Sequence, residues 1–193
     1  MWLVATEDAL SEAVAQRLLR EATVDPSTAS FVRRNGFGYL RNRCREFSQV
    51  RHCPVLIMTD MDNWECPPTL KVDWFGEESL AQNVLFRVAV REVEAWLLAD
   101  RLGLAAFLGV NVNSIERGCD LIQDPKRHLL AVARRARREI REDLLPPRNS
   151  VATQGFGYNQ RLSEFVLEHW SPSAAVTESP SLERAVRRIR ELA

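Results

Sequence analysis

The sequence lacks several residue patterns on which common enzyme classes depend. Its four cysteines (Cys44, Cys53, Cys66 and Cys119) form no Cys-x-x-Cys pair, which disfavours a zinc knuckle or a thioredoxin-type redox site. Its three histidines are scattered and form neither His-x-His nor His-Glu-x-x-His, so a zinc hydrolase is disfavoured as well. No Gly-x-x-x-x-Gly-Lys-Ser/Thr loop occurs, which excludes a P-loop nucleotide site in this chain.

Long apolar segments are also missing. No uncharged run approaches the ~18 residues that a membrane-spanning helix needs. The N-terminal segment 1–8 has no basic region before its apolar residues and becomes acidic at Glu7, unlike a signal peptide. We therefore expect a cytoplasmic protein with no membrane segment, in which the cysteines are reduced thiols.

The chain also has no net charge and few lysines. The 26 Lys plus Arg balance 26 Asp plus Glu, and only two of the basic residues are lysines. This balance excludes a histone-like polycation but leaves room for a local basic surface. Residues 1–100 contain 11 basic and 15 acidic side chains, and residues 101–193 contain 15 and 11. With 193 residues, of which 46% are hydrophobic and 27% charged, the chain is typical of one soluble globular unit.

Apolar runs alternate with amphipathic segments in the first hundred residues. We expect strands at 2–5, 54–59 and 84–90. The run at 54–59 is apolar without alternation, as in strands that are buried on both faces of a parallel sheet. We expect helices at 9–20, capped by Thr6, and at 92–101, ending near Gly103. Strands that alternate with helices indicate an α/β core.

The C-terminal third is predicted to be helical and basic. Helices are expected at 126–142, 159–170 and 181–192, so that residues 1–125 form the α/β core and residues 126–193 a helical region packed on the same unit. On the first of these helices Arg134, Arg138 and Arg141 would form one stripe. Such a stripe is either a solvated face or a surface that contacts a nucleic-acid backbone.

Acidic residues follow the first two long apolar runs. Glu7 follows the first, and Asp60 and Asp62 follow the second. On an extended segment the two aspartates of Asp-x-Asp point the same way, and crowded carboxylates favour a cation between them. Carboxylate oxygens suit Mg²⁺ or Mn²⁺, which polarise a phosphoryl oxygen and orient a nucleophilic water. The alternatives are a hydrogen-bonded turn for Asp60 and Asp62, and a helix-dipole role for Glu7.

Two further glutamates and one tyrosine are weaker candidates. Glu92 and Glu94 lie two apart, so on a regular helix only one of them can face a shared site. We expect one to be functional and the other solvated, although the preceding strand-to-helix junction could turn Glu92 inward. Tyr158 and Asn159 offer a polar contact that no spacing requires. The segment 155–158, Gly-Phe-Gly-Tyr, repeats the letters of 36–39, which is too short to indicate a repeat.

These residues carry a resemblance to a known family. Val4–Asp8 and Asp60-Met61-Asp62 resemble the two motifs of TOPRIM domains, which pair a glutamate after the first strand with Asp-x-Asp after a later one. Segment 91–100, with Glu-Val-Glu-Ala-Trp-Leu-Leu-Ala-Asp, and Asp124-Pro125-Lys126 resemble a bacterial TOPRIM-like family of unassigned function. That family is related to the nuclease domains of overcoming-lysogenization-defect (OLD) proteins. The resemblance covers roughly residues 2–130.

The resemblance implies both a fold and a site. The fold would be a TOPRIM/Rossmann-like, mostly parallel sheet flanked by helices, with a helical C-terminal part. The site would be a Mg²⁺- or Mn²⁺-dependent phosphodiester centre of a nuclease on DNA or RNA, in proteins that often defend against phage. By motif, the catalytic residues would be Glu7, Asp60, Asp62 and Lys126, and the metal-binding residues Glu7, Asp60, Asp62, Glu92 and Glu94.

One departure from the family pattern keeps a second hypothesis open. The first motif is commonly Glu-Gly-x-Thr-Glu, whereas Thr6-Glu7 follows Val4-Ala5 without the glycine. The alternative is a non-catalytic module of the same fold that binds nucleic acid or a protein partner, such as the product of a neighbouring gene. Topoisomerase- or primase-like chemistry is weaker, because 193 residues leave little room for an accessory domain. The sequence leaves the oligomeric state and the choice among DNA, RNA and nucleotide open.

Overall fold

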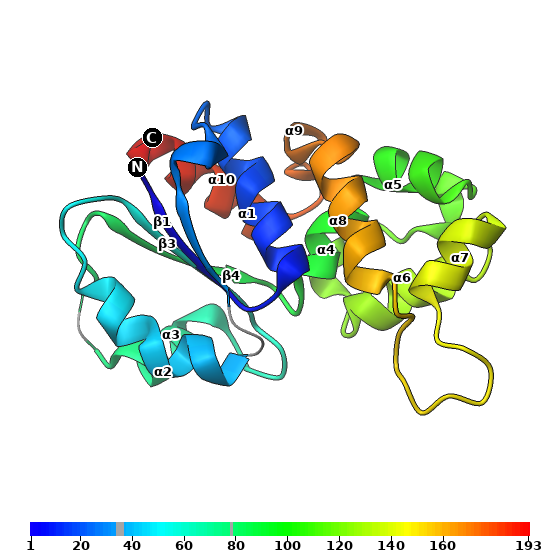
Figure 1. Ribbon diagram of the computed structural model, residues 1–193, viewed down its shortest axis with the longest axis horizontal. Coiled ribbons are helices and arrows are strands. Elements are labelled where there is room, and N and C mark those ends of the chain that lie inside the picture. The colour runs from blue at the N-terminus through cyan, green and yellow to red at the C-terminus, as the bar shows by residue number, and fades with distance from the viewer. Residues whose placement is uncertain (34–36, 78) are drawn as a thin grey trace.

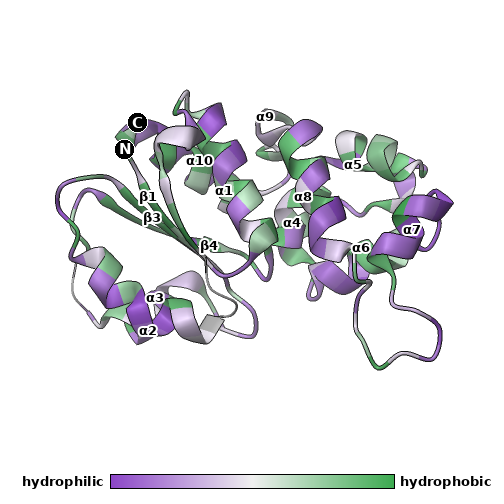
Figure 2. Ribbon diagram, viewed as in Figure 1, coloured by the Kyte–Doolittle hydropathy of each residue, from purple (hydrophilic) through white to green (hydrophobic). Residues whose placement is uncertain are grey.

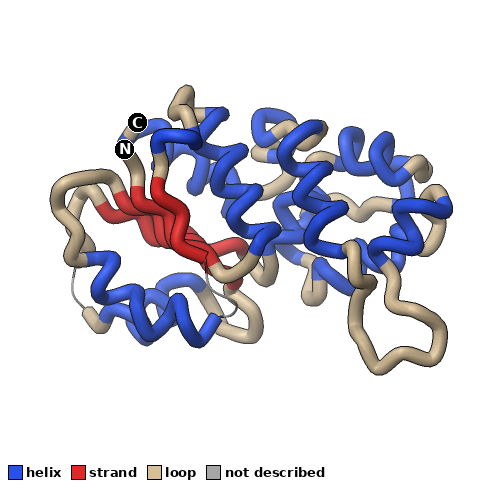
Figure 3. Tube along the Cα trace, viewed as in Figure 1, coloured by secondary structure: helices blue, strands red, loops and turns tan. Residues whose placement is uncertain are grey.

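Four parallel strands form the sheet at the centre of the α/β part (Figure 3). The computed structural model describes residues 1–33, 37–77 and 79–193. The strands pair in the order β2-β1-β3-β4, and every pair is parallel. Their bounds are β1 (Leu3–Thr6), β2 (Ser30–Arg33), β3 (Val55–Asp60) and β4 (Val84–Ala89). The expected α/β architecture with a parallel sheet flanked by helices is thus confirmed.

Helices cover both faces of this sheet (Figure 1). Val4, Leu56 and Leu85 belong to the apolar cluster that includes α1 and α10, whereas Ile57 and Phe86 belong to the cluster formed with α2 and α3. This two-sided burial explains why β3 has no polar alternation. The helices of this part are α1 (Ala9–Glu21), α2 (Phe37–Ser48), α3 (Pro67–Phe75) and α10 (Pro180–Leu192).

The other helices pack beside the sheet as a second lobe (Figure 1). They are α4 (Val93–Ala99), α5 (Arg101–Leu108), α6 (Pro125–Ala133), α7 (Arg138–Leu144), α8 (Tyr158–Glu168) and α9 (Pro172–Ala175). Their buried sides join α1 and the sheet in one apolar cluster that runs across residue 125. The fully buried Trp96 donates to Ser181 Oγ at 2.7 Å, and Trp170 donates to the Trp96 carbonyl at 3.1 Å. Figure 2 shows that these helices carry both hydrophilic and hydrophobic residues.

Several sequence predictions about single elements need correction. Strand β2 was not expected, because it is short and lies in a polar, arginine-rich stretch. The cap of α1 is Asp8, not Thr6: the strand extends through Thr6, and Asp8 Oδ1 accepts from the Ser11 N–H at 2.8 Å. Gly103 lies inside α5 and does not end a helix, since α4 ends at Ala99 and the side chain of the next residue, Asp100, caps α5. The first Gly-Phe-Gly-Tyr segment lies partly outside the described residues.

The expected continuous helix from 126 to 142 is wrong. The chain forms α6, leaves the helix after Ala133, and starts again as α7 after the N-cap Arg137. The Arg137 backbone is extended, its N–H donates to the Leu108 carbonyl at 3.1 Å, and its Nη2 donates to the Ala106 carbonyl at 3.0 Å. Docking onto the C-terminal end of α5 therefore breaks the helix, with no Pro or Gly in the sequence to signal it.

Within the described ranges, none of the helices combines the length and the apolar character needed to cross a membrane.

Candidate active site

The candidate site lies where the chain leaves β1 and β3. Strand β1 pairs with β2 on one side and with β3 on the other. The strand order therefore reverses between β1 and β3. Ligands of open α/β sheets bind beyond the carboxyl ends of the strands at such a point. Glu7 is the first residue after β1, and Asp60 is the last residue of β3. The predicted acids therefore lie at this position.

Hydrogen bonds hold Glu7 against the end of β3. Its Oε1 accepts from the Thr59 hydroxyl and from the Asp60 N–H, the latter at 3.2 Å. Burial raises the pKa of Glu7, and the two hydrogen bonds oppose that rise. Thr59 was not predicted from the sequence, although a hydroxyl side chain next to a strand-end aspartate is a signal for such a contact.

Asp60 connects the end of β3 to the start of α4. Its Oδ1 accepts from the Val93 N–H at 2.8 Å, at the end of the helix where backbone donors are free. Burial, followed by the charges of Glu94, Glu7 and Asp62, raises the pKa of Asp60 well above its usual value. Asp60 is thus a carboxylate surrounded by other carboxylates in a poorly solvated position.

Asp62 reaches the same region by a different backbone path from the expected one. The extended Asp-x-Asp geometry is wrong, because Asp62 has a left-handed backbone, with φ 47°, and is exposed. Its N–H donates to the Arg91 carbonyl at 2.8 Å, and Arg91 Nη1 donates back to the Asp62 carbonyl at 3.2 Å. Partial burial raises the pKa of the Asp62 carboxyl and the Lys126 charge lowers it, so its side chain is electrostatically part of the site.

Glu92 and Glu94 both face the site, so the expectation that one of them is solvated is wrong. Glu92 is the N-cap of α4, with an extended backbone at φ −145° and ψ 157°, and the helical angle between the two side chains therefore does not apply. Its Oε2 accepts from the Lys126 N–H at 2.9 Å. Glu94 is 4% exposed and accepts from the Tyr158 hydroxyl at 2.7 Å.

Burial is the main electrostatic influence on both glutamates. It raises the pKa of Glu94 to about 7, partly offset by the Tyr158 hydrogen bond. It also raises the pKa of Glu92, against the hydrogen bond from the Lys126 backbone. The same surroundings raise the pKa of Tyr158, which keeps its hydroxyl a hydrogen-bond donor.

Lys126 brings a positive charge from the helical lobe to these acids. It lies in the first turn of α6, after the N-cap Asp124 and Pro125. Its charge lowers the pKa of Asp62, Glu92 and Glu94, and its ammonium lies 4.9 Å from the centre of the Tyr158 ring. Lys126 therefore lies close to the acidic residues that follow β1 and β3.

Tyr158 is a more central part of the site than the sequence predicted. It begins α8 and is 1% exposed, whereas its neighbour Phe156 is 95% exposed. Gly157 allows the turn before α8 to approach Asp143, because a Cβ there would lie 2.8 Å from the Asp143 Cβ. The Gly-Phe-Gly-Tyr segment directly before a helix was the available signal, but nothing local indicated that Tyr158 meets Glu94.

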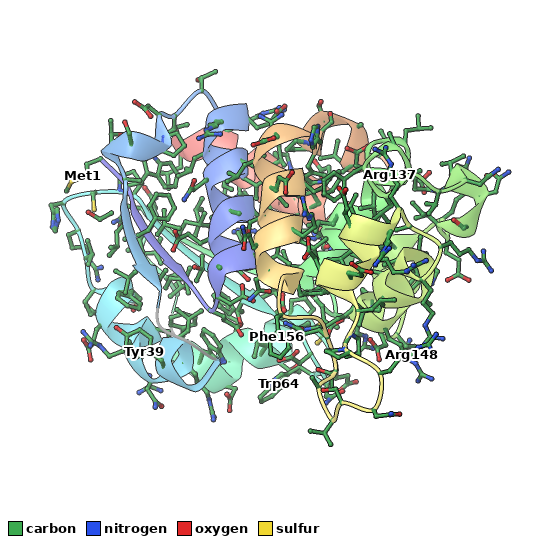
Figure 4. All side chains as sticks on the ribbon, turned by 45° about the vertical axis from the view of Figure 1, so that its right-hand side comes forward. Met1, Tyr39, Trp64, Arg137, Arg148 and Phe156 are labelled. Carbon is green, nitrogen blue, oxygen red and sulfur yellow. The ribbon has the colours of Figure 1, made fainter. Side chains whose placement is uncertain are left out.

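The three arginines predicted to hold substrate do not form one helical stripe. Arg134 is the C-cap of α6, whereas Arg138 and Arg141 belong to α7, so the break at Arg137 separates them. Arg138 also pairs with Glu142 at 2.7 Å. Helix α7 lies at the end of the molecule opposite the sheet (Figure 1), and Arg137 lies there too, far from Met1 and Tyr39 (Figure 4).

The donor atoms of the cluster suit a hard divalent cation. No group of three or more His, Cys, Asp or Glu side chains in the described part of the chain is already arranged to hold a metal ion. Mg²⁺, however, keeps several waters and often takes only one or two protein carboxylates. Within the same residues, hydrogen bonds occupy Glu7 Oε1 and Asp60 Oδ1 but not the second oxygen of either group.

Comparisons of the chain with protein-family models, with curated proteins and with solved structures found no match.

Proposed function

We propose that this protein is a divalent-metal-dependent phosphodiesterase, acting as a nuclease on DNA or RNA. The observation that carries the proposal is the convergence of Glu7, Asp60, Asp62, Glu92 and Glu94 at the carboxyl ends of the strands, beside one lysine. Each of these carboxylates has a raised pKa because it is wholly or partly removed from water, and several also repel one another. Such crowding is costly unless a cation offsets it. The TOPRIM resemblance of the same residues supports the proposal independently of their burial.

The residues divide into three roles. Glu7 and Asp60 would hold Mg²⁺ or Mn²⁺ through their unused oxygens, with Asp62 at the exposed side. The bound cation would supply Lewis acidity toward a phosphoryl oxygen. Lys126 would contact the phosphate as a positive charge. Glu94 and Tyr158 would hold the start of α4, and thereby Asp60, in place.

The test is cleavage of end-labelled single-stranded DNA, double-stranded DNA and RNA in Mg²⁺, in Mn²⁺ and in EDTA. We expect cleavage that needs the metal and that falls roughly 100-fold or more in Asp60→Asn and Glu7→Gln. The side-chain amide in Asp60→Asn retains an oxygen that can accept from the Val93 N–H, so this variant should fold. Glu139→Gln, on exposed α7, is the matched control and should cleave normally. Full activity of Asp60→Asn would refute the assignment.

A binding module of the same fold is the second candidate function. The observation that favours it is the lack of a preset metal group among residues 1–33, 37–77 and 79–193. This candidate predicts nucleic-acid or protein binding that is the same in Mn²⁺ and in EDTA and is unaffected by Asp60→Asn. Calorimetric titration with Mn²⁺ separates the candidates, because the nuclease proposal requires a saturable site that Asp60→Asn removes.

We also propose a role in phage defence, which rests on the resemblance to the TOPRIM-like family. Cells that express the wild-type protein should resist a panel of phages better than cells that express Asp60→Asn at the same level. Equal plaque numbers across the panel would count against a defence role but not against the nuclease activity.

A further inference from the structure

The outer edge of β4 carries backbone groups with no strand beside them. β4 is the last strand of the described sheet. Because the Val55 N–H donates to the Asn83 carbonyl and the Met61 N–H to the Ala89 carbonyl, residues 85, 87 and 89 use their backbone groups toward β3. Phe86 and Val88 therefore direct their N–H and C=O groups outward. No backbone hydrogen bond within the described residues takes up these groups.

A groove of about 630 Å³ follows this edge. Its floor includes Val84, Phe86 and Val88 of β4. One wall comes from the start of α3 and the other from α10, which cover opposite faces of the sheet. The groove is therefore placed where a further strand of the sheet would lie. Edge strands left open in this way are the sites at which extended peptides add to sheets.

Among the described residues, the charged side chains that line this groove are all cations. Lys71 comes from α3, Arg87 from β4, and Arg184 and Arg188 from α10. The Arg87 Nε is buried without a hydrogen-bond partner in the described part of the chain. Burial, followed by the nearby arginine charges, lowers the pKa of Arg87 to about 10. Arg87 is half-buried, and leaving its buried Nε without a hydrogen-bond partner is costly, so an incoming carboxylate would offset that cost.

The two walls differ in chemistry. On the α10 side, Arg87 meets the positive charges of Arg184 and Arg188, which Glu191, the ion-pair partner of Arg188, offsets in part. On the α3 side, Phe86 and Val88 present apolar surface of the cluster that includes α3. Successive side chains of a strand point to opposite faces, so a strand in this groove would meet cations and apolar surface alternately. A second copy of β4 is disfavoured, because antiparallel pairing centred on residue 87 would place the two Arg87 side chains against each other.

We propose that the β4 groove binds an extended acidic segment of a partner protein, which adds to the sheet as a fifth strand. Its acidic side chains face Arg87, Arg184 and Arg188, and its alternate, apolar side chains face Phe86 and Val88. The outward backbone groups of Phe86 and Val88 supply the hydrogen bonds. This interaction is separate from the proposed nuclease activity.

The test uses a fluorescein-labelled eight-residue peptide in which glutamate and valine alternate. We expect saturable binding to the whole protein, lost when every glutamate is replaced by lysine. Arg184 is exposed, so Arg184→Gln should fold and should weaken binding about tenfold, whereas Arg135→Gln, an exposed arginine outside the groove, should not. Asp60→Asn should bind the peptide normally, which keeps this result independent of the nuclease test.

Amide hydrogen exchange distinguishes strand addition from simple ion pairing. Bound peptide should slow exchange at Phe86 and Val88 and leave Leu85 and Arg87, already bonded to β3, unchanged. Binding without slower exchange at Phe86 and Val88 would overturn strand addition. Absence of peptide binding would overturn the proposal and leave the cations as protection against edge-to-edge aggregation. The proposal would also fail if a single-stranded oligonucleotide displaced the peptide and if Arg184→Gln weakened binding of the oligonucleotide more than binding of the peptide.

Discussion

At the scale of single residues, Glu94 combines deep burial with a negative charge. Its pKa rises from 4.5 to about 7, chiefly through burial. A carboxyl whose pKa is raised by folding binds its proton more tightly in the folded state, so ionisation costs folding free energy. That cost is absent below pH 4.5, the pKa of the unfolded state. It grows as the pH rises from 4.5 to about 7 and reaches its full size above the folded-state pKa of about 7.

Glu94→Gln should therefore stabilise the metal-free protein at pH 8. The substituted amide keeps an acceptor for the Tyr158 hydroxyl and removes the charge. We expect a gain on the order of 1–2 kcal/mol, or roughly 3–8 °C in Tm, in EDTA at pH 8 and little change at pH 4.5. Thermal melts across this pH range measure it, with exposed Glu139→Gln as the control. A uniform shift at all pH values would show that packing, not charge, had changed.

Substitution by alanine should have different effects on stability at Gly157 and Gly38, the second glycines of the two Gly-Phe-Gly-Tyr segments. A Cβ at Gly157 would lie 2.8 Å from the Asp143 Cβ, in a side chain that Arg161 holds at 2.5 Å. Gly157→Ala should cost about 1–3 kcal/mol. Gly38, in α2, has no atom within 4 Å of its Cβ position, so Gly38→Ala should be neutral or stabilise by up to ~1 kcal/mol. Urea denaturation compares them, and equal effects would contradict the close approach of Gly157 to Asp143.

At the scale of elements, Arg137 decides that α6 and α7 are two helices. Its guanidinium and backbone N–H satisfy carbonyls at the end of α5. Arg137→Ala should cost about 1 kcal/mol, since a charge-assisted bond at a helix C-terminus is lost. Arg135→Ala, two residues before it and exposed, should change the unfolding free energy by less than ~0.5 kcal/mol. The account of the break would be wrong if the two substitutions cost the same.

At the scale of the whole molecule, the acidic site joins the sheet to the helical lobe. Glu7 and Asp60 come from the sheet, Glu92 and Glu94 from the start of α4, and Lys126 and Tyr158 from helices of the lobe. A cation bound between them would favour the folded state by mass action, by about 2.7 kcal/mol at a concentration 100 times Kd.

We accordingly expect Mg²⁺ and Mn²⁺ to raise the Tm of the wild-type protein by several degrees. Differential scanning calorimetry in EDTA and in excess metal measures this increase. Asp60→Asn should melt without a metal-dependent increase, whereas Glu139→Gln should keep it. A shift of equal size in Asp60→Asn would mean that the ion binds elsewhere.

The candidate site was predictable where it depends on strand ends. Glu7, Asp60 and Asp62 follow apolar runs, and parallel strands bring such positions to one edge. The backbone of the second aspartate, Asp62, was predicted wrongly, because its left-handed turn leaves no local signature in the sequence. Tyr158 was undervalued for a related reason: its partner Glu94 lies 64 residues away, and only long-range packing brings them together.

By itself, the sequence determined the parallel α/β core, since the apolar run at β3 has no polar face to expose to water and further apolar runs alternate with helices. It also determined which acids follow those strands. Only the tertiary structure decided that Glu92 and Glu94 face one site, that the basic helix breaks at Arg137, and that cations line the open edge of β4. These features depend on contacts between distant segments, and neither helical period nor strand alternation encodes such contacts.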